Sequence, residues 1–174
     1  MRTQLIRGRL YAVSTDPRPG GPADARTLRR AFHSLIRRFG LLDAERTPCG
    51  QPVPVSHAHA LIELLARPGV RQADLGDSLG LSKSAVSRMV DQLERRRWLE
   101  RRADAGDGRV RRLMLTAKGR QVALRINEAS LGRFSVILEA VPAVARAGVI
   151  ASLELLRDAI PRGQQTRGDR RTRR

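Results

Sequence analysis

The sequence predicts a mainly helical fold with one small antiparallel β-hairpin. Apolar residues recur at intervals of three and four through most of residues 23–160, which is the period of helices packed on a core. The exception is a short segment in which two strand-like runs flank the turn-forming sequence ADAGDG. At 174 residues the chain is long enough for one core. We expect one domain over residues 23–160, a flexible basic arm at 1–22 and a disordered basic tail at 161–174.

The first part of the domain predicts two helices separated by prolines. From residue 23 to 42 one apolar stripe recurs at helical spacing, formed by Leu28, Phe32, Leu35, Phe39 and Leu42. Prolines at positions 48, 52 and 54 then break the chain. Ser56 is placed to cap a second helix over residues 57–66, which Pro68 and Gly69 end.

Two helices joined by a tight turn follow. A short helix over residues 72–79 is ended by Gly80, whose conformational freedom suits the turn. Ser82 stands at an N-cap position for a helix over residues 83–96. The residues of this helix that should face the core are Val86, Met89, Val90 and Leu93.

The hairpin and two further helices complete the domain. Trp98 and Leu99 begin the first strand, and residues 111–115 form the second. Thr116 caps a long helix reaching toward residue 141, and Pro142 separates it from a last helix over 144–160. The predicted order is four helices, two strands and two helices, without internal repeats.

The charge of the chain limits its partners. There are 34 Lys and Arg against 17 Asp and Glu, a net charge of +17, which favours nucleic acid or an acidic membrane surface. Nearly all the cations are arginines, which suit phosphate and guanine, although a GC-rich genome explains this bias equally well. No apolar run is long enough to span a membrane and no secretory signal is recognisable, so we expect a cytoplasmic protein.

The predicted helix over residues 83–96 has the features of a DNA-reading helix. With its apolar face inward, the side chains left free are Lys83, Ser84, Ser87, Arg88 and Asp91. All but the aspartate lie in the first two turns, where the helix dipole and free amides favour phosphate, and an arginine can bind guanine through two hydrogen bonds. An ordinary solvated helix face explains the same pattern, so the helix alone leaves both interpretations open.

The hairpin favours the nucleic-acid interpretation. Residues 95–112 hold eight arginines and three acidic residues, a density that costs repulsion unless an anion relieves it. A DNA minor groove relieves it, and inserted arginine is favoured where that groove is narrow. Asp107 is close enough to Arg109 in the sequence to orient its guanidinium for insertion.

These segments resemble the MarR family of winged helix-turn-helix transcriptional regulators. The matching residues are LGLSKSAVSRMVDQLE (79–94), WLERR (98–102), Asp104, Asp107 and Arg109 of the wing, and LMLTAKG (113–119). The resemblance implies a winged helix-turn-helix reader at about 56–115, between N- and C-terminal dimerisation helices at about 23–47 and 116–160. Helix and wing together give the expected DNA-binding residues, which are Ser82, Lys83, Ser84, Ser87, Arg88, Arg101, Asp107, Arg109 and Arg111.

The resemblance also implies a homodimer on double-stranded DNA with an inverted repeat, and repression relieved by a small molecule or an oxidant. The apolar stripes of residues 28–42 and 149–160 support the dimer physically, because a monomer would expose both. Packing of these stripes onto the helix at 116–141 is the alternative.

A ligand pocket of this family would lie between the dimerisation helices and the reader. Its candidate residues here are Phe32, Ile36, Phe39, His57, His59 and Leu61. The two histidines would point about 200° apart on a helix, so we expect no metal site. Cys49 is the only cysteine, which excludes an internal disulfide framework and leaves a redox role open.

Two features depart from the family pattern. Arg97 stands where the family often has glycine, in the turn after the reading helix. A residue with a β-carbon in a left-handed turn costs about 1 kcal/mol, so this helix could end differently. The sequence VPAVARAG (141–148) also replaces a glutamate-rich start of the last helix.

The sequence thus predicts a sequence-specific, dimeric DNA-binding transcriptional regulator, and within that class a repressor released by a small-molecule ligand. The alternative is a nonspecific architectural protein of the nucleoid, which the charge and the basic tail would suit. No Gly-rich phosphate loop, metal-spaced histidine pair or nucleophile with a nearby base is recognisable. We therefore expect neither an enzyme nor a cofactor.

Overall fold

The computed structural model describes residues 2–6, 9–13, 21–104, 106–107 and 110–160. Over these residues the chain forms six helices and five strands, which confirms the mainly helical prediction. The helices are α1 (Pro22–Phe39), α2 (Val55–Ala66), α3 (Gln72–Leu79), α4 (Lys83–Arg95), α5 (Ala117–Glu139) and α6 (Ala143–Ala159). The strands are β1 (Arg2–Ile6), β2 (Arg9–Val13), β3 (Val70–Arg71), β4 (Leu99–Ala103) and β5 (Arg111–Leu115).

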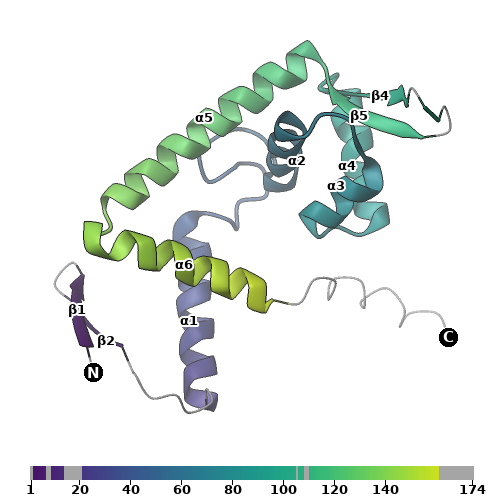
Figure 1. Ribbon diagram of the computed structural model, residues 1–174. Coiled ribbons are helices and arrows are strands. Elements are labelled where there is room, and N and C mark those ends of the chain that lie inside the picture. The colour runs from purple at the N-terminus through teal and green to yellow at the C-terminus, as the bar shows by residue number, and fades with distance from the viewer. Residues whose placement is uncertain (1, 7–8, 14–20, 105, 108–109, 161–174) are drawn as a thin grey trace.

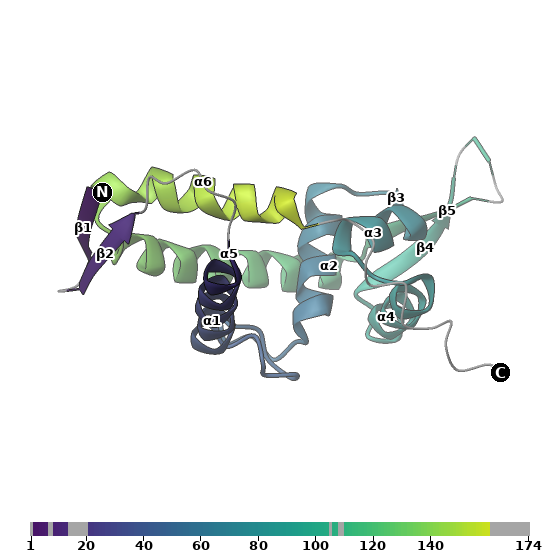
Figure 2. The same ribbon diagram turned by 90° about the horizontal axis from the view of Figure 1, so that it is seen from below.

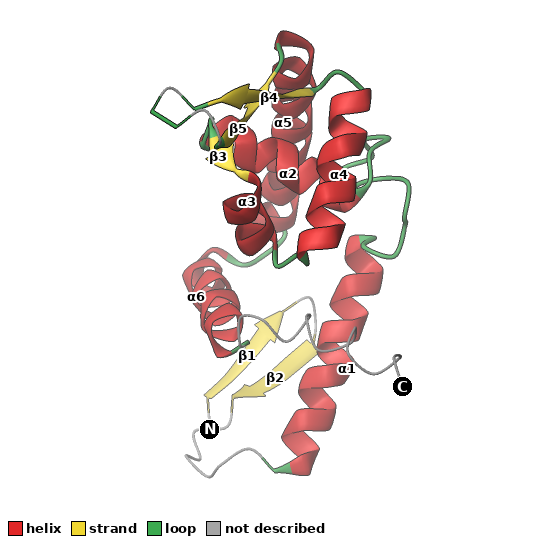
Figure 3. Ribbon diagram, turned by 90° about the vertical axis from the view of Figure 1, so that its right-hand side faces the viewer, coloured by secondary structure: helices red, strands yellow, loops and turns green. Residues whose placement is uncertain are grey.

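The core lies in a compact head made of α2, α3, α4, the sheet and the first half of α5 (Figure 1). The sheet has the order β3-β5-β4, with both neighbouring pairs antiparallel. The inner face of α4 is buried as expected, and its residues belong to one core cluster with Leu61 and Leu64 of α2 and with Ala123 and Ile126 of α5. This head presents α4 and the β4–β5 hairpin on one side of the molecule (Figure 3).

Two of the three predicted helix caps are confirmed. The hydroxyl oxygen of Ser82 accepts from the amide of Ala85 at 3.3 Å, and that of Thr116 accepts from the amide of Gly119 at 3.0 Å. The prediction that Ser56 caps α2 is wrong. The helix begins at Val55, two residues before the predicted start, with Pro54 at the N-cap, so Ser56 lies inside the first turn and cannot cap it.

The sequence did not predict β3, which has two residues and makes no periodic pattern. Val70 and Arg71 pair with Leu113 and Arg112 of β5, so this strand exists only because the hairpin lies beside it. An unpredicted hairpin also occupies much of the N-terminal arm, where β1 and β2 pair antiparallel from Arg2↔Val13 to Ile6↔Arg9. Residues 2–6 and 9–13, for which the sequence predicted a flexible arm, therefore form strands.

Outside the head, α1 and α6 expose their apolar faces. Figure 2 shows α5 extending away from the head and α6 returning from its far end, with α1 crossing nearby. No described residue of α1 or α6 is buried. The large apolar side chains exposed on these two helices and on the second half of α5 include Leu28, Phe32, Leu35, Leu131, Phe134, Val136, Val144, Leu153 and Leu155. The alternative of packing within one chain holds only at the end of α1, where the Phe39 ring lies 5.4 Å from the Phe134 ring of α5, whereas Leu28, Phe32 and Leu35 stay exposed.

Candidate nucleic-acid interface

The first half of helix α4 carries polar side chains that are exposed to solvent. Lys83, Ser84 and Arg88 are exposed, while Ser87 and Asp91 are half-buried. The turn that brings α4 against α3 is made by Gly80, whose φ of 63° is left-handed, as the sequence predicted. Ser82 is engaged in the structure itself, since its hydroxyl caps the helix and lies 3.2 Å from the hydroxyl of Ser84. The amino end of α4 thus combines free backbone amides, one lysine and one arginine.

The far end of α4 keeps a left-handed turn at Arg97. This residue has a φ of 59°, the one positive value outside glycine among the described residues. Its amide donates to the Glu94 carbonyl at 2.8 Å, and the next amide, of Trp98, donates to the Leu93 carbonyl at 3.0 Å. These two bonds form the Schellman arrangement that glycine normally completes. The helix therefore ends in the left-handed turn that glycine normally forms, although a residue with a β-carbon costs free energy there.

The turn at Arg97 is fastened to the start of α5. The Thr116 hydroxyl donates to the Arg97 carbonyl at 2.7 Å, and the Thr116 amide donates to the Trp98 carbonyl at 3.1 Å. Gly119 lies directly against this carbonyl, and a β-carbon there would overlap the oxygen and come within 2.6 Å of the carbonyl carbon. The Leu-Thr-x-x-Gly sequence thus joins the wing, α4 and α5 at one point.

The two faces of the hairpin differ in what they carry. Leu99 pairs with Leu115 and Arg101 with Leu113, so Arg101 shares a face with buried leucines. On the other face Arg102 pairs with Arg112. Arg101 bonds to both Asp91 and Glu94 of α4, whereas Arg102 is bonded to its neighbour Glu100 at 2.8 Å. Among the predicted DNA-binding residues that the structure describes, Arg101 is therefore the one ion-paired with carboxylates.

Asp104 organises the turn at the start of the wing tip. Its carboxylate accepts from the amides of Gly106 and Asp107 at 2.9 and 3.2 Å, and from Arg112 Nε at 2.5 Å. The hydrogen bond from Arg112, then the two amides, lower the pKa of Asp104. Asp107 is exposed beside this turn. Arg109, the predicted wing-tip arginine, lies outside the described residues.

Three cations of the predicted set are exposed on the head. Lys83 and Arg88 come from α4 and Arg111 from β5. Within the described residues none of the three has a carboxylate at ion-pairing distance. Charges left unpaired in this way are available to phosphate or base edges.

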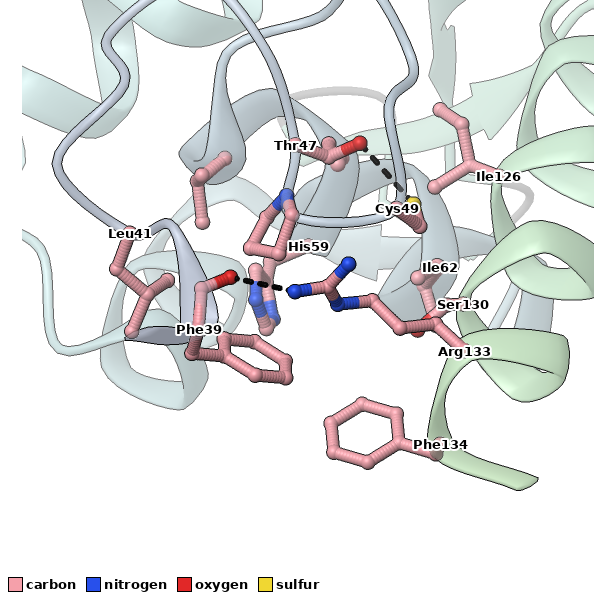
Figure 4. Close-up of a pocket in the computed structure, with 13 residues that line it drawn as sticks. Phe39, Leu41, Thr47, Cys49, His59, Ile62, Ile126, Ser130, Arg133 and Phe134 are labelled. Carbon is pink, nitrogen blue, oxygen red and sulfur yellow. Dashed lines mark hydrogen bonds between the residues drawn. The ribbon is translucent and has the colours of Figure 1, made fainter. Parts of the chain in front are cut away.

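A cavity of about 260 Å³ lies between the end of α1, the loop at 47–49, α2 and α5 (Figure 4). Two of the six residues suggested for a pocket, Phe39 and His59, line it. The other four do not: Leu61 is fully buried in the core, Phe32 and Ile36 lie elsewhere on α1, and His57 turns toward α4. Sequence spacing could not tell the cavity residues of α2 from its core residues, because one face of this helix lines the cavity and the opposite face packs in the core.

The cavity holds a polar group that the sequence analysis missed. Arg133 of α5 donates from Nη2 to the Phe39 carbonyl at 3.0 Å and stacks on the Phe39 ring, with Cζ 5.1 Å from its centre (Figure 4). Its Nε is buried without a hydrogen-bond partner among the described residues. Cys49 also lines the cavity, and its Sγ lies 3.0 Å from the Thr47 hydroxyl.

His57 links the cavity helix to the reading helix. Its Nε2 lies 2.7 Å from Oε1 of Gln92 on α4, and burial lowers the pKa of its imidazole despite this hydrogen bond. Over the described residues no group of three or more His, Cys, Asp or Glu is arranged to hold a metal ion. In that same part of the chain, no helix is long and apolar enough to cross a membrane.

Comparisons with known proteins agree with this geometry. A sequence model described as MarR family matches residues 51–110, which cover the head from α2 into the wing. A transcriptional repressor of Escherichia coli K12, MprA, is 38% identical over 52 residues, which are 30% of each chain. The match therefore spans less than a third of that curated relative.

Solved structures extend the likeness beyond the head. The PcaV transcriptional regulator of Streptomyces coelicolor, in complex with its natural ligand, is 27% identical with a TM-score of 0.55, covering 86% of this chain and 98% of PcaV. FabT of Streptococcus pneumoniae, in complex with DNA, is 21% identical with a TM-score of 0.61, covering 77% of this chain and 92% of FabT. The second likeness shows the fold alone.

Proposed function

We propose that the chain is a DNA-binding transcriptional repressor of the MarR family, which the family match over residues 51–110 and the likeness to PcaV support. It reads a palindromic site with α4 in the major groove and the β4–β5 wing in the adjacent minor groove. The observation that carries this proposal is the set of exposed cations Lys83 and Arg88 on α4 and Arg111 on β5, which have no carboxylate at ion-pairing distance among the described residues. The relatives that it resembles, MprA and PcaV, are described as a transcriptional repressor and a transcriptional regulator.

The proposed reader works as a homodimer. The apolar faces of α1, α6 and the second half of α5 are exposed, and Val144 and Leu155 reach 88% and 73% exposure. A patch of this size on one chain favours a second copy as its cover. Twofold symmetry then gives two reading helices and two wings, which would bind an inverted repeat.

The first test selects binding sites from fragmented genomic DNA at near-physiological salt. Recovered fragments that share an inverted repeat upstream of few genes support the proposal. Fragments without a common sequence would replace it with the architectural alternative, whose affinity depends on charge and falls steeply with salt for every sequence alike. Arg88 and Ser84 are side chains for which a nonspecific protein has no need.

We further propose that a small anion entering the cavity releases the protein from DNA. Half-buried Arg133 has no carboxylate partner among the described residues, and its guanidinium lies over the ring of Phe39, which itself lies 5.4 Å from the ring of Phe134. An unpaired cation in an apolar cavity attracts a flat anion more strongly than its neutral analogue. Helix α2 lines the cavity through His59 and reaches α4 through His57, which offers a physical route to the reader.

A matched pair of probes tests the ligand proposal. Benzoate and its neutral analogue benzamide are compared by thermal unfolding and by release of the selected duplex. Stabilisation by benzoate only, lost in Arg133→Met, supports an anion site. Equal effects of the two compounds, or an unchanged response in the variant, would refute it. The redox role of Cys49 stays a prediction, checked by peroxide treatment of wild type and Cys49→Ser.

A further inference from the structure

We infer that Arg101 does not contact DNA but is a positioning residue that braces the wing against the reading helix. The inference rests on the proposed function and concerns the same interface. Nη2 of Arg101 lies 2.6 Å from Oδ1 of Asp91, and Nη1 is bonded to Glu94. Its side chain is 26% exposed, well below the 65% of the neighbouring Arg102.

The position of Arg101 in the hairpin explains this bonding. Arg101 pairs with Leu113, and since paired residues share a face of the sheet, its side chain leaves on the face that covers the core. Asp91 and Glu94 are three residues apart, so they lie on the same side of α4, one turn apart. A planar guanidinium reaches both carboxylates at once, which an ammonium cannot do equally well.

The brace has two consequences for DNA binding. It fixes the angle between α4 and the wing, so that helix and hairpin meet neighbouring grooves without further ordering of the hairpin. It also compensates two carboxylates on the reading helix that would otherwise repel phosphate. Arg101 thus acts through Asp91 and Glu94, whereas Arg88 and Arg111 act on the DNA directly.

The test is a cycle of Arg101→Met, the pair Asp91→Asn with Glu94→Gln, and all three together, measured on the duplex recovered from the selection. A brace predicts that Arg101→Met weakens binding by about tenfold or more in the natural background. With both carboxylates neutralised, the same change should cost less than about threefold. Arg101→Lys, which keeps the charge, should recover only part of the loss. Arg102→Met on the other face is the matched control and should show no coupling to the two carboxylates.

The salt dependence separates a brace from a phosphate contact. Loss of a phosphate contact lowers the slope of log affinity against log salt by about 0.9, whereas loss of a brace leaves the slope nearly unchanged. A drop of that size in Arg101→Met, or an equal loss of affinity in both backgrounds, would overturn the inference. If no preferred duplex exists, the proposed function fails first. In that case, thermal unfolding of the same variants tests the brace. A brace requires that Arg101→Met costs less stability when the two carboxylates are already neutralised.

Discussion

Gly119→Ala should destabilise the protein although it replaces glycine by alanine inside a helix. Alanine is the better helix former by about 1 kcal/mol, so helix propensity alone predicts stabilisation. The new β-carbon, however, would overlap the Trp98 carbonyl oxygen and lie 2.6 Å from the carbonyl carbon, where ordinary contact is 3.4–4 Å. The Trp98 carbonyl and the α5 backbone at residue 119 both belong to the main chain, so neither can rotate out of the contact as a side chain could. Helix α5 must instead move off the turn.

The size of the effect follows from what that movement breaks. Thr116 holds the turn through two hydrogen bonds, from its hydroxyl to Arg97 and from its amide to Trp98, and each contributes about 1 kcal/mol. Overpacking a close contact costs a further 1–3 kcal/mol or so. After the gain in propensity, we expect a net loss of about 2–4 kcal/mol, or roughly 4–16 °C in Tm for a domain of this size.

The matched control is Gly132→Ala in the same helix. A β-carbon at Gly132 meets nothing within 4 Å in the single chain, so within one protomer only the propensity gain applies and Tm should rise by a few degrees or stay level. Both variants are unfolded at one fixed protein concentration, because a dimer makes Tm depend on concentration. A Gly119→Ala protein as stable as wild type would show that the turn and α5 are not in this close contact.

Three further predictions concern the turn after α4, the buried histidine of α2 and the exposed arginine of α4. Arg97→Gly should raise stability by about 1 kcal/mol in thermal unfolding, because it removes the left-handed cost, while Arg96→Gly, at a φ of −75°, should lower it. Burial lowers the pKa of folded His57, so below pH 6.5 the unfolded chain binds a proton that the folded chain refuses, and stability falls as pH drops until the folded pKa is reached. His57→Gln should remove this part of the pH slope and His59→Gln should keep it; equal slopes in both variants would contradict the assignment. Arg88→Ala should weaken binding to the selected duplex by about 1–3 kcal/mol and relax preference at one base pair, and a loss shared by all base pairs would point to phosphate instead.

Local signals in the sequence were enough to predict the reader. The caps at Ser82 and Thr116, the bounds of α3 and β5, and the buried face of α4 are all set by residues within a few positions of one another. The same signals carried the resemblance to the MarR family, since the wing sequence and the Leu-Thr-x-x-Gly sequence are short and continuous. The strain at Arg97 was visible for the same reason, because it depends on one residue in one turn.

The tertiary structure alone decided which of these residues are engaged with one another. Arg101 and Arg102 are adjacent and alike in sequence, yet opposite faces of one strand give one of them two carboxylates of α4 and leave the other at the surface. Likewise Arg133 is one of 34 basic residues in the sequence, and only the meeting of α5 with the end of α1 places it beside Phe39 in a cavity. Periodicity fixes which side of an element is apolar, whereas the partner of a polar side chain depends on contacts between segments far apart in the chain.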